Sequence, residues 1–205
     1  MISADRVAHA SGDLPFFGTR TKDGGPQLLN YYWFQEAFSS DECKNIISLA
    51  QEYEKQGGTT FAGDGNEYRK STIRWIPPNE STSWIYERIR DLSIEANETY
   101  KLDICGFTEH LQFTEYEGKG AKYGYHVDIG PWNYHRKLSV VLQLSNPKDY
   151  TGGDLVINPG GELLYPDKTQ GTVIFFPSIL QHEVTPLESG NRYSIVSWIS
   201  GPPWK

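Results

Sequence analysis

The sequence contains little cysteine and no long apolar run, and each absence excludes a class of protein. Cys43 and Cys105 are the only cysteines, so a disulfide-stabilised secreted domain is not expected, and we interpret both as small buried hydrophobes. The N-terminal residues lack the apolar core of a signal peptide, and no later segment is apolar over the length of a membrane span. These absences predict a cytoplasmic protein that does not associate with membranes.

Positive charge is also in the minority. The chain has 19 lysine and arginine residues against 26 aspartate and glutamate residues, which gives a formal net charge of -7 and a pI of about 5.2. An acidic protein repels nucleic acid and anionic lipid at long range. We therefore expect no nucleic-acid partner, although a local basic patch is compatible with this charge.

Aromatic residues, in contrast, are abundant. They make up 14% of the 205 residues, within a hydrophobic content of 38%. A chain of this length can form one core, and large aromatic side chains suit strands. We expect a single domain over residues 1–205 that comprises an irregular, glycine-punctuated arm (1–30), a helical support region (31–110) and a β-rich core (111–200).

The support region begins with an aromatic strand and a helix. The strand is predicted over Tyr31–Phe34, and Ser39 and Glu42 have the spacing of a capping box at a helix start. Gly57 and Gly58 end the helical pattern. Apolar residues recur at the spacing of one helical face, which we expect to be buried: Cys43, Ile46, Ile47 and Ala50.

A second helix is predicted after a loop over 59–67 and a strand over 69–76. Pro77 and Pro78 end that strand, and Asn79 is the candidate N-cap of the helix. The apolar positions again define one face: Ile85, Ile89, Leu92 and Ala96.

The pattern changes to strands from Leu111 onward. Between Leu138 and Leu144, apolar residues alternate with Ser139, Val141 and Gln143, so one face is uniformly apolar and the mixed face can line a polar pocket. Together with the helices, these strands predict an α+β fold, mainly β, in which N-terminal helices brace a double-stranded β-helix, or jelly roll. Further strand candidates are 155–157, 163–165, 172–176 and 193–199.

Two histidines and one aspartate have the pattern of a metal site. His126 and Asp128 are two residues apart, so in an extended strand they project from the same face. His182, on a later strand-like segment, completes a set of two imidazoles and one carboxylate, which leaves half of an octahedral ion open. We predict these three as the metal ligands and the catalytic residues. His135 is rejected as a further ligand because a loop histidine needs no special role.

Several segments, in order and spacing, resemble the catalytic core of the 2-oxoglutarate and Fe(II)-dependent oxygenases, in the prolyl 4-hydroxylase-like branch. The resemblance spans residues 111–200, with a weaker likeness back to about Tyr31. It implies Fe(II) at the three ligands, with 2-oxoglutarate and O2 as co-substrates and ascorbate as an optional reductant. The segments that carry it are 111–118, 123–128, 138–145, 152–155, 182–186 and Arg192-Tyr193-Ser194.

The resemblance also implies which residues bind the co-substrate. Arg192 suits the distal carboxylate of 2-oxoglutarate because a planar guanidinium binds a carboxylate with two hydrogen bonds. Ser194 shares its strand face and can add a hydroxyl donor. Tyr116 falls where a tyrosine of the first core strand reaches the co-substrate in the family. Gln143 occupies a position where relatives use varied polar residues, and it departs from the tyrosine or threonine found there.

The expected substrate contacts are aromatic or basic. The resemblance places a substrate-covering loop between the metal ligands and the next strand, where Trp132, Tyr134 and Arg136 occur. Tyr123 precedes His126 by three residues, and Trp198 resembles a pocket-wall tryptophan of the prolyl hydroxylases. Each of these aromatic residues could equally serve as ordinary packing.

These residues predict a dioxygenase that hydroxylates a C–H bond, foremost of a prolyl residue in a peptide or protein. One alternative is hydroxylation of a small molecule or free amino acid. Another is a cupin-like metal enzyme without 2-oxoglutarate, against which Arg192 argues, and a third is a non-enzymatic jelly-roll binding module. The sequence leaves the oligomeric state open.

Overall fold

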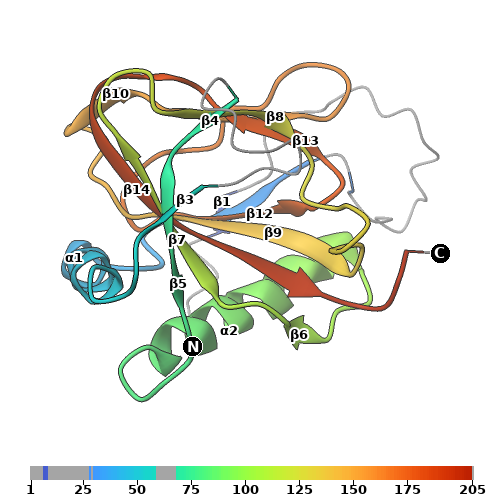
Figure 1. Ribbon diagram of the computed structural model, residues 1–205. Coiled ribbons are helices and arrows are strands. Elements are labelled where there is room, and N and C mark those ends of the chain that lie inside the picture. The colour runs from blue at the N-terminus through green and yellow to red at the C-terminus, as the bar shows by residue number, and fades with distance from the viewer. Residues whose placement is uncertain (1–6, 9–27, 29, 59–67, 205) are drawn as a thin grey trace.

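The computed structural model describes residues 7–8, 28, 30–58 and 68–204, and Figure 1 shows two β-sheets with two helices on one side. Most of the predicted arm over 1–30, and the predicted loop over 59–67, lie outside the described residues. All pairings between the strands are antiparallel. Within the described ranges, no helix is long and apolar enough to cross a membrane.

The larger sheet has ten strands in the described chain. Their order is β1-β2-β12-β9-β14-β7-β5-β3, while β10 and β6 pair with β14 away from this path. The bounds are β1 Val7–Ala8, β2 Tyr32–Phe34, β3 Gln56–Gly57, β5 Thr72–Ile76, β6 Gly106–Phe107, β7 Leu111–Glu117, β9 Arg136–Gln143, β10 Tyr150–Gly152, β12 Val173–Pro177 and β14 Leu187–Ser200.

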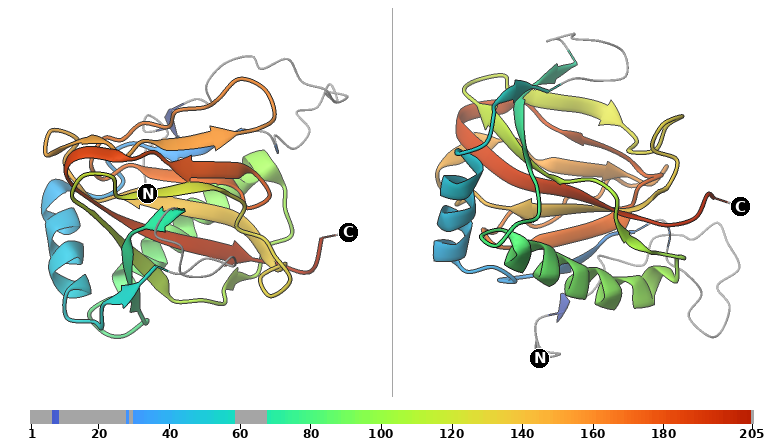
Figure 2. Two further views of the ribbon diagram at one scale, coloured as in Figure 1. Left: turned by 45° about the horizontal axis from the view of Figure 1, so that its top comes forward. Right: turned by 60° about the horizontal axis from the view of Figure 1, so that its bottom comes forward.

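The smaller sheet faces the larger one, as both views in Figure 2 show. It has four strands in the order β11-β13-β8-β4. The sheets enclose an apolar cluster to which the larger one contributes Val141 and Phe176 and the smaller one Ile157. The predicted mainly-β jelly roll is therefore confirmed. The bounds are β4 Arg69–Lys70, β8 Lys122–His126, β11 Leu155–Asn158 and β13 Gln181–Val184.

The helices α1 Ser40–Ala50 and α2 Ser83–Tyr100 brace the larger sheet. The predicted capping box is present in α1, since the Ser39 hydroxyl accepts from the Glu42 amide and the Glu42 carboxylate accepts from the Ser39 amide. The predicted apolar faces of both helices, with Ile47 only partly buried, pack in one core cluster with Leu138 and Val140 of β9. The helices therefore cover the face of the sheet that points away from the second sheet.

Two predicted boundaries near these helices are wrong. The first helix ends at Ala50 rather than near Gly57, because residues 56–57 pair with β5 as strand β3. The second begins at Ser83, and Asn79 instead stabilises the preceding turn by accepting hydrogen bonds from Ser81.

Three other local predictions are also wrong. The predicted strand over 69–76 divides at Ser71, since β4 pairs with β8 in the smaller sheet and β5 with β7 in the larger. The predicted strand over 163–165 is reduced to one bridge between Leu164 and Ile157. Both cysteines are free, and Cys43 is buried as expected, but Cys105 is exposed.

The glycine pair before β11 permits a close approach between two turns. Gly152 and Gly153 have φ values of 70° and 62°, a region that favours glycine. A Cβ on Gly152 would lie 2.3 Å from the Pro186 carbonyl oxygen, and one on Gly153 would lie 3.3 Å from Cδ of Arg192. The pair thus lets the chain pack directly against the Arg192 side chain.

Candidate active site

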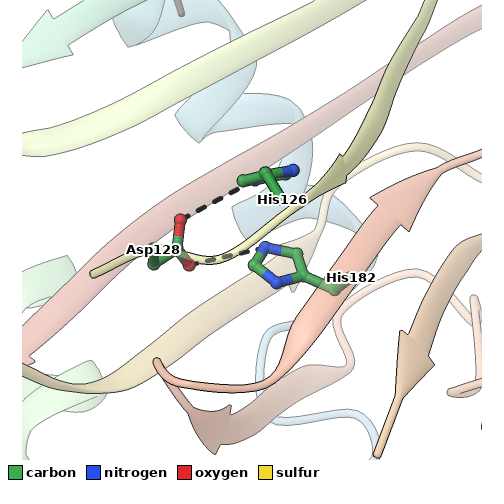
Figure 3. Close-up of side chains that lie close together, drawn as sticks. All are labelled: His126, Asp128 and His182. Carbon is green, nitrogen blue, oxygen red and sulfur yellow. Dashed lines mark ion pairs between the residues drawn. The ribbon is translucent and has the colours of Figure 1, made fainter. Parts of the chain in front are cut away.

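The strand pairing of the smaller sheet brings together the three predicted metal ligands. His126 ends β8 and is the register partner of His182 on β13, while Asp128 lies in the bend after β8 (Figure 3). The Asp128 carboxylate lies 3.8 Å from Nε2 of His126 and 3.4 Å from Nε2 of His182. One ligand atom from each residue lies within 4.8 Å of the others. Among the described residues, this is the single His/Cys/Asp/Glu group with metal-ligand spacing.

Backbone carbonyls fix the protonation of both imidazoles. Nδ1 of His126 lies 2.8 Å from the Gly124 carbonyl oxygen, and Nδ1 of His182 lies 3.0 Å from that of Leu180. A carbonyl only accepts hydrogen bonds, so each Nδ1 carries the proton and each Nε2 offers its lone pair. Both Nε2 atoms face Asp128, which is the tautomer that metal binding requires.

The surroundings of His126 and Asp128 also keep these two ligands in their metal-binding ionisation states. Burial, together with the neighbouring His182, lowers the pKa of His126 to about 4. Burial opposes ionisation of Asp128, but the two imidazoles and the Ser139 hydroxyl outweigh it and lower the pKa of this carboxyl. A neutral imidazole and a carboxylate at neutral pH follow from these directions.

The three ligands open into a cavity of about 1000 Å³ between the two sheets, and Arg192 lies in its wall. Arg192 is 1% exposed and is the register partner of Tyr116 across β14 and β7. Its Nη2 donates to Oε1 of Gln143 at 2.9 Å, whereas Nε and Nη1 have no hydrogen-bond partner in the described chain. A buried cation with unused donors is costly unless an anion joins it. The wall of the cavity is therefore suited to a carboxylate.

The other residues predicted to bind the co-substrate are Tyr116, Ser194 and Gln143, and they differ in whether they line the cavity. Tyr116 and Ser194 are buried and line the cavity, and the Tyr116 ring centroid lies 5.3 Å from the guanidinium carbon of Arg192. Burial raises the pKa of Tyr116, so its hydroxyl remains a donor. Gln143 does not line the cavity and instead lies behind Arg192 as its hydrogen-bond partner. Its direct contact with the co-substrate stays a prediction.

Two of the predicted substrate residues contact the metal-ligand segment itself. The Tyr123 ring stacks on His126, with centroids 3.6 Å apart, and burial raises the pKa of its phenol to about 12. Arg136 forms a bidentate ion pair with Glu109 and also donates to the Asp128 carbonyl at 3.1 Å. Both side chains line the cavity while supporting the metal ligands.

The remaining substrate candidates differ strongly in exposure. Trp132 is 82% exposed at the edge of the cavity, and Tyr134, in the same loop, is exposed but outside the cavity wall. Trp198 is buried in the wall, with the guanidinium carbon of Arg136 3.5 Å from its ring centroid. The loop histidine, His135, lies 3.7 Å from Glu109 and not among the metal ligands.

Two further residues of the site were not among the predicted ones. Arg69 lines the cavity, and its guanidinium carbon lies 4.3 Å from the Tyr123 ring centroid. A two-residue strand carries no periodic signal, so sequence pattern could not place Arg69 there. Ser139 donates to the Asp128 carboxylate at 2.5 Å. Sequence analysis could have identified Ser139 from its position on the mixed face of the strand that forms β9.

Comparison with known proteins agrees with this geometry. The 2OG-Fe(II) oxygenase superfamily matches residues 111–200. A PKHD-type hydroxylase of Crocosphaera subtropica is 34% identical over 170 residues, which cover 78% of this chain and 74% of the relative. A PKHD-type hydroxylase of a Synechococcus species is 40% identical over 145 residues, covering 69% and 64%. The chain therefore belongs to the 2OG-Fe(II) oxygenase superfamily.

Solved structures with the same fold include two prolyl hydroxylases. A Pseudomonas putida prolyl-4-hydroxylase aligns with a TM-score of 0.69 at 21% identity, covering 84% of this chain and 92% of that one. A prolyl hydroxylase from Trichoplax adhaerens, in complex with a peptide fragment of hypoxia inducible factor, aligns with a TM-score of 0.71 at 20% identity and 83% of both chains. By sequence, the protein is a 2-oxoglutarate-dependent dioxygenase, which uses Fe(II), 2-oxoglutarate and O2, and by fold it resembles the prolyl hydroxylases.

Proposed function

We propose that this dioxygenase hydroxylates prolyl residues of a peptide or protein, with His126, Asp128 and His182 as the iron ligands and Arg192 as the anchor of 2-oxoglutarate. The observation that carries the proposal is the presence, in one cavity, of three converging ligand atoms and a buried guanidinium with unused donors. The prolyl hydroxylases with the same fold, one of them bound to a peptide, support the substrate class.

The residues of the site have the chemistry needed to bind iron and 2-oxoglutarate. Two imidazole Nε2 atoms and a carboxylate are the donor set of a facial triad with open positions. Nε and Nη1 of Arg192 have no partner among the described residues, so one of them, together with the second proton of Nη2, can donate in parallel to one carboxylate. When bound, iron and 2-oxoglutarate let one oxygen atom of O2 enter a substrate C–H bond while 2-oxoglutarate is decarboxylated to succinate.

The protein's own contribution is to orient the reactants and exclude water. Arg192, together with the Tyr116 hydroxyl, fixes the far end of 2-oxoglutarate, and Gln143 holds the guanidinium from behind. The carbonyl contacts at both Nδ1 atoms keep the imidazoles aimed at one point. The cavity walls are largely buried, so the reacting C–H bond is shielded from solvent.

The rim of the cavity supports an extended peptide as the substrate. Tyr68, Val127 and Trp132 are large apolar residues that stay exposed and contribute to the cavity lining. Trp198 supplies a buried indole deeper in the wall. Exposed apolar residues gathered at one opening are typical of a binding surface, and flat rings pack well against proline.

The test is to incubate the iron-loaded enzyme with a panel of proline-containing peptides, with ascorbate as an optional reductant. We expect O2-dependent succinate and a peptide mass increase of one oxygen atom, located on proline. His182→Ala should abolish both products, whereas the matched loop variant His135→Ala should retain bound iron. Retention of iron by His182→Ala at unchanged affinity would overturn the ligand assignment.

The same assay separates the alternatives. Hydroxylation of free amino acids or other small molecules, with no hydroxyproline in any peptide, would replace the peptide substrate by a small one. Iron-dependent turnover without succinate would indicate a cupin-like reaction. Failure to bind iron after anaerobic reconstitution would indicate a non-enzymatic binding module.

The loop that carries Trp132 can be tested separately. Trp132→Ala should weaken peptide use, while turnover of 2-oxoglutarate without peptide stays nearly unchanged.

A further inference from the structure

A chain of two buried serines leads from the core of the larger sheet to the Asp128 carboxylate. Ser139 on β9 is fully buried, and its Oγ lies 2.5 Å from Oδ2 of Asp128 and 3.0 Å from Oγ of Ser178. Ser178 is fully buried as well, and its carbonyl accepts from the Asp128 amide at 3.1 Å. Neither serine lines the cavity. Any effect of these serines on the reaction must therefore pass through Asp128.

The direction of this hydrogen-bond chain follows from counting protons. A serine hydroxyl has one proton to donate, and an ionised carboxylate can only accept. Ser139 therefore donates to Asp128, the charged acceptor, while its Oγ lies within hydrogen-bond distance of Oγ of Ser178. The buried chain thus ends in a charge-assisted hydrogen bond on a single carboxylate oxygen.

We infer that Ser139 is a positioning residue that fixes the Asp128 carboxylate for coordination through one oxygen. The inference rests on the proposed iron site. Two imidazoles and one carboxylate oxygen leave three positions of an octahedral ion open, whereas a carboxylate bound through both oxygens would occupy one of them. Oδ2 lies 3.4 Å from Nε2 of His182 and Oδ1 lies 3.8 Å from Nε2 of His126, and by engaging Oδ2 Ser139 favours coordination through Oδ1 over the two-oxygen arrangement. It thereby keeps a position available for 2-oxoglutarate or O2.

A pair of variants with the same shape isolates the hydroxyl. Ser139→Thr keeps the donor and Ser139→Val replaces it by a methyl group, so both enlarge the site equally. We would measure Co(II) affinity by competition with a chelator, the visible absorption of bound Co(II), and the Michaelis constant for 2-oxoglutarate. Relative to Thr, Val should alter the absorption spectrum, because the second carboxylate oxygen adds a ligand, and should raise the Michaelis constant for 2-oxoglutarate by roughly 10- to 100-fold, the size of effect typical for loss of a partner to a metal ligand. Ser178→Ala, which removes only the outer hydroxyl, should have a smaller effect in the same direction.

Ser197→Ala is the matched control. Ser197 is also a buried serine of the larger sheet, on β14, but its Oγ has no hydrogen-bond partner in the described chain, and it does not line the cavity. Its Co(II) affinity, spectrum and Michaelis constant should equal those of the wild type. Thermal unfolding of each metal-free variant shows whether Thr and Val are equally well folded. If neither is accommodated, Ser139→Ala against the wild type gives the same comparison without added volume.

The outcomes separate this inference from the proposed function. If the wild type binds Co(II) but Thr and Val, or Ala and the wild type, share the same spectrum and Michaelis constant, the role of Ser139 is overturned and the metal site stands. If the wild type binds no Co(II) or Fe(II), the proposed iron site and the role of Ser139 are both overturned. Loss of stability in Val without a change in the spectrum or the Michaelis constant would show that Ser139 only supports the fold, and would also overturn the inference.

Discussion

At the scale of single residues, Arg192 is the side chain whose surroundings most require a ligand. Its guanidinium is almost completely buried, yet only Nη2 has a hydrogen-bond partner within the described ranges. The Gly152–Gly153 turn packs against its side chain and restricts its movement. A buried guanidinium that is already held in place binds a carboxylate strongly, because binding costs little further side-chain entropy.

Replacing Arg192 should therefore affect the co-substrate specifically. Loss of a bidentate, charge-assisted contact costs about 2 to 4 kcal/mol, so Arg192→Ala should raise the Michaelis constant for 2-oxoglutarate by roughly 30- to 1000-fold. Arg192→Lys should recover only part of this, because an ammonium cannot form the two parallel hydrogen bonds. The exposed Arg90, which pairs with its neighbour Asp91, provides the control Arg90→Ala. A Michaelis constant within about twofold of the wild type for Arg192→Ala would contradict the placement of the co-substrate.

The depressed pKa of His126 predicts a pH dependence of stability in the metal-free protein. The unfolded imidazole takes up a proton near its usual pKa of 6.5, whereas the folded one does so only at about 4. As the pH falls from 6.5 to 4, the unfolded state gains protons first, so the free energy of unfolding decreases, by up to about 3 kcal/mol from this group. Above pH 6.5 the contribution is complete.

Urea unfolding of the metal-free protein at about pH 7.5 and about pH 4.5 checks this prediction, with His126→Asn as the reference. Asparagine does not titrate, so the variant should lose less stability between the two pH values than the wild type. Equal losses in both proteins would mean that burial does not hold His126 neutral.

At the scale of elements, periodicity predicted what lies in the core better than where each element begins. The apolar face of α2 and the alternation along β9 depend on burial, which the sequence records directly. The start of α2 depends on whether Asn79 caps a helix or a turn, and both use the same side-chain oxygen. The predicted strand breaks at Ser71 because its two halves pair with different sheets. No local sequence pattern indicates which sheet a strand will join.

The same distinction applies to the candidate site. The histidines and Asp128 could be found because their spacing is a local signature, and Arg192 because it followed within the resemblance. Arg69 reaches the cavity through the pairing of β4 with β8, and Glu109, which also lines it, forms an ion pair with Arg136. Contacts of this kind between distant segments require the fold. The division of the chain into arm, support region and core, and the cytoplasmic location, stay predictions.

The helix α2 offers a matched pair of residues for testing its role as a brace. Ile89 is fully buried in the core beneath the larger sheet, whereas Ile94, on the same helix, is 55% exposed. Ile89→Ala should lower the free energy of unfolding by about 2 to 5 kcal/mol through lost burial and a residual cavity. Ile94→Ala should change it by less than about 0.5 kcal/mol. Similar losses from both variants, measured by urea unfolding, would show that the helix does not pack as described.

At the scale of the whole molecule, each of the two sheets supplies a different part of the site. The smaller sheet carries His126 and His182 on paired strands, and the larger one carries Arg192 and the serine that holds Asp128. The helices pack on the far face of the larger sheet (Figure 2), and the cavity lies on its other side. A substrate therefore meets both halves of the site only between the sheets, which is where the exposed aromatic rim lies.

The net charge of the molecule should bias which peptides reach that opening. The formal charge of -7 creates a negative long-range potential, so a proline peptide flanked by lysines should be used more efficiently than the same peptide flanked by glutamates. The ratio of the two kcat/KM values should be roughly two- to tenfold at low ionic strength and should shrink at about 0.5 M salt, where charges are screened within a few ångströms. A glycine-flanked peptide provides the neutral reference and should change least with salt. A preference for the glutamate-flanked peptide at low salt would instead mean that the local arginines near the cavity, Arg69 and Arg136, outweigh the charge of the whole protein.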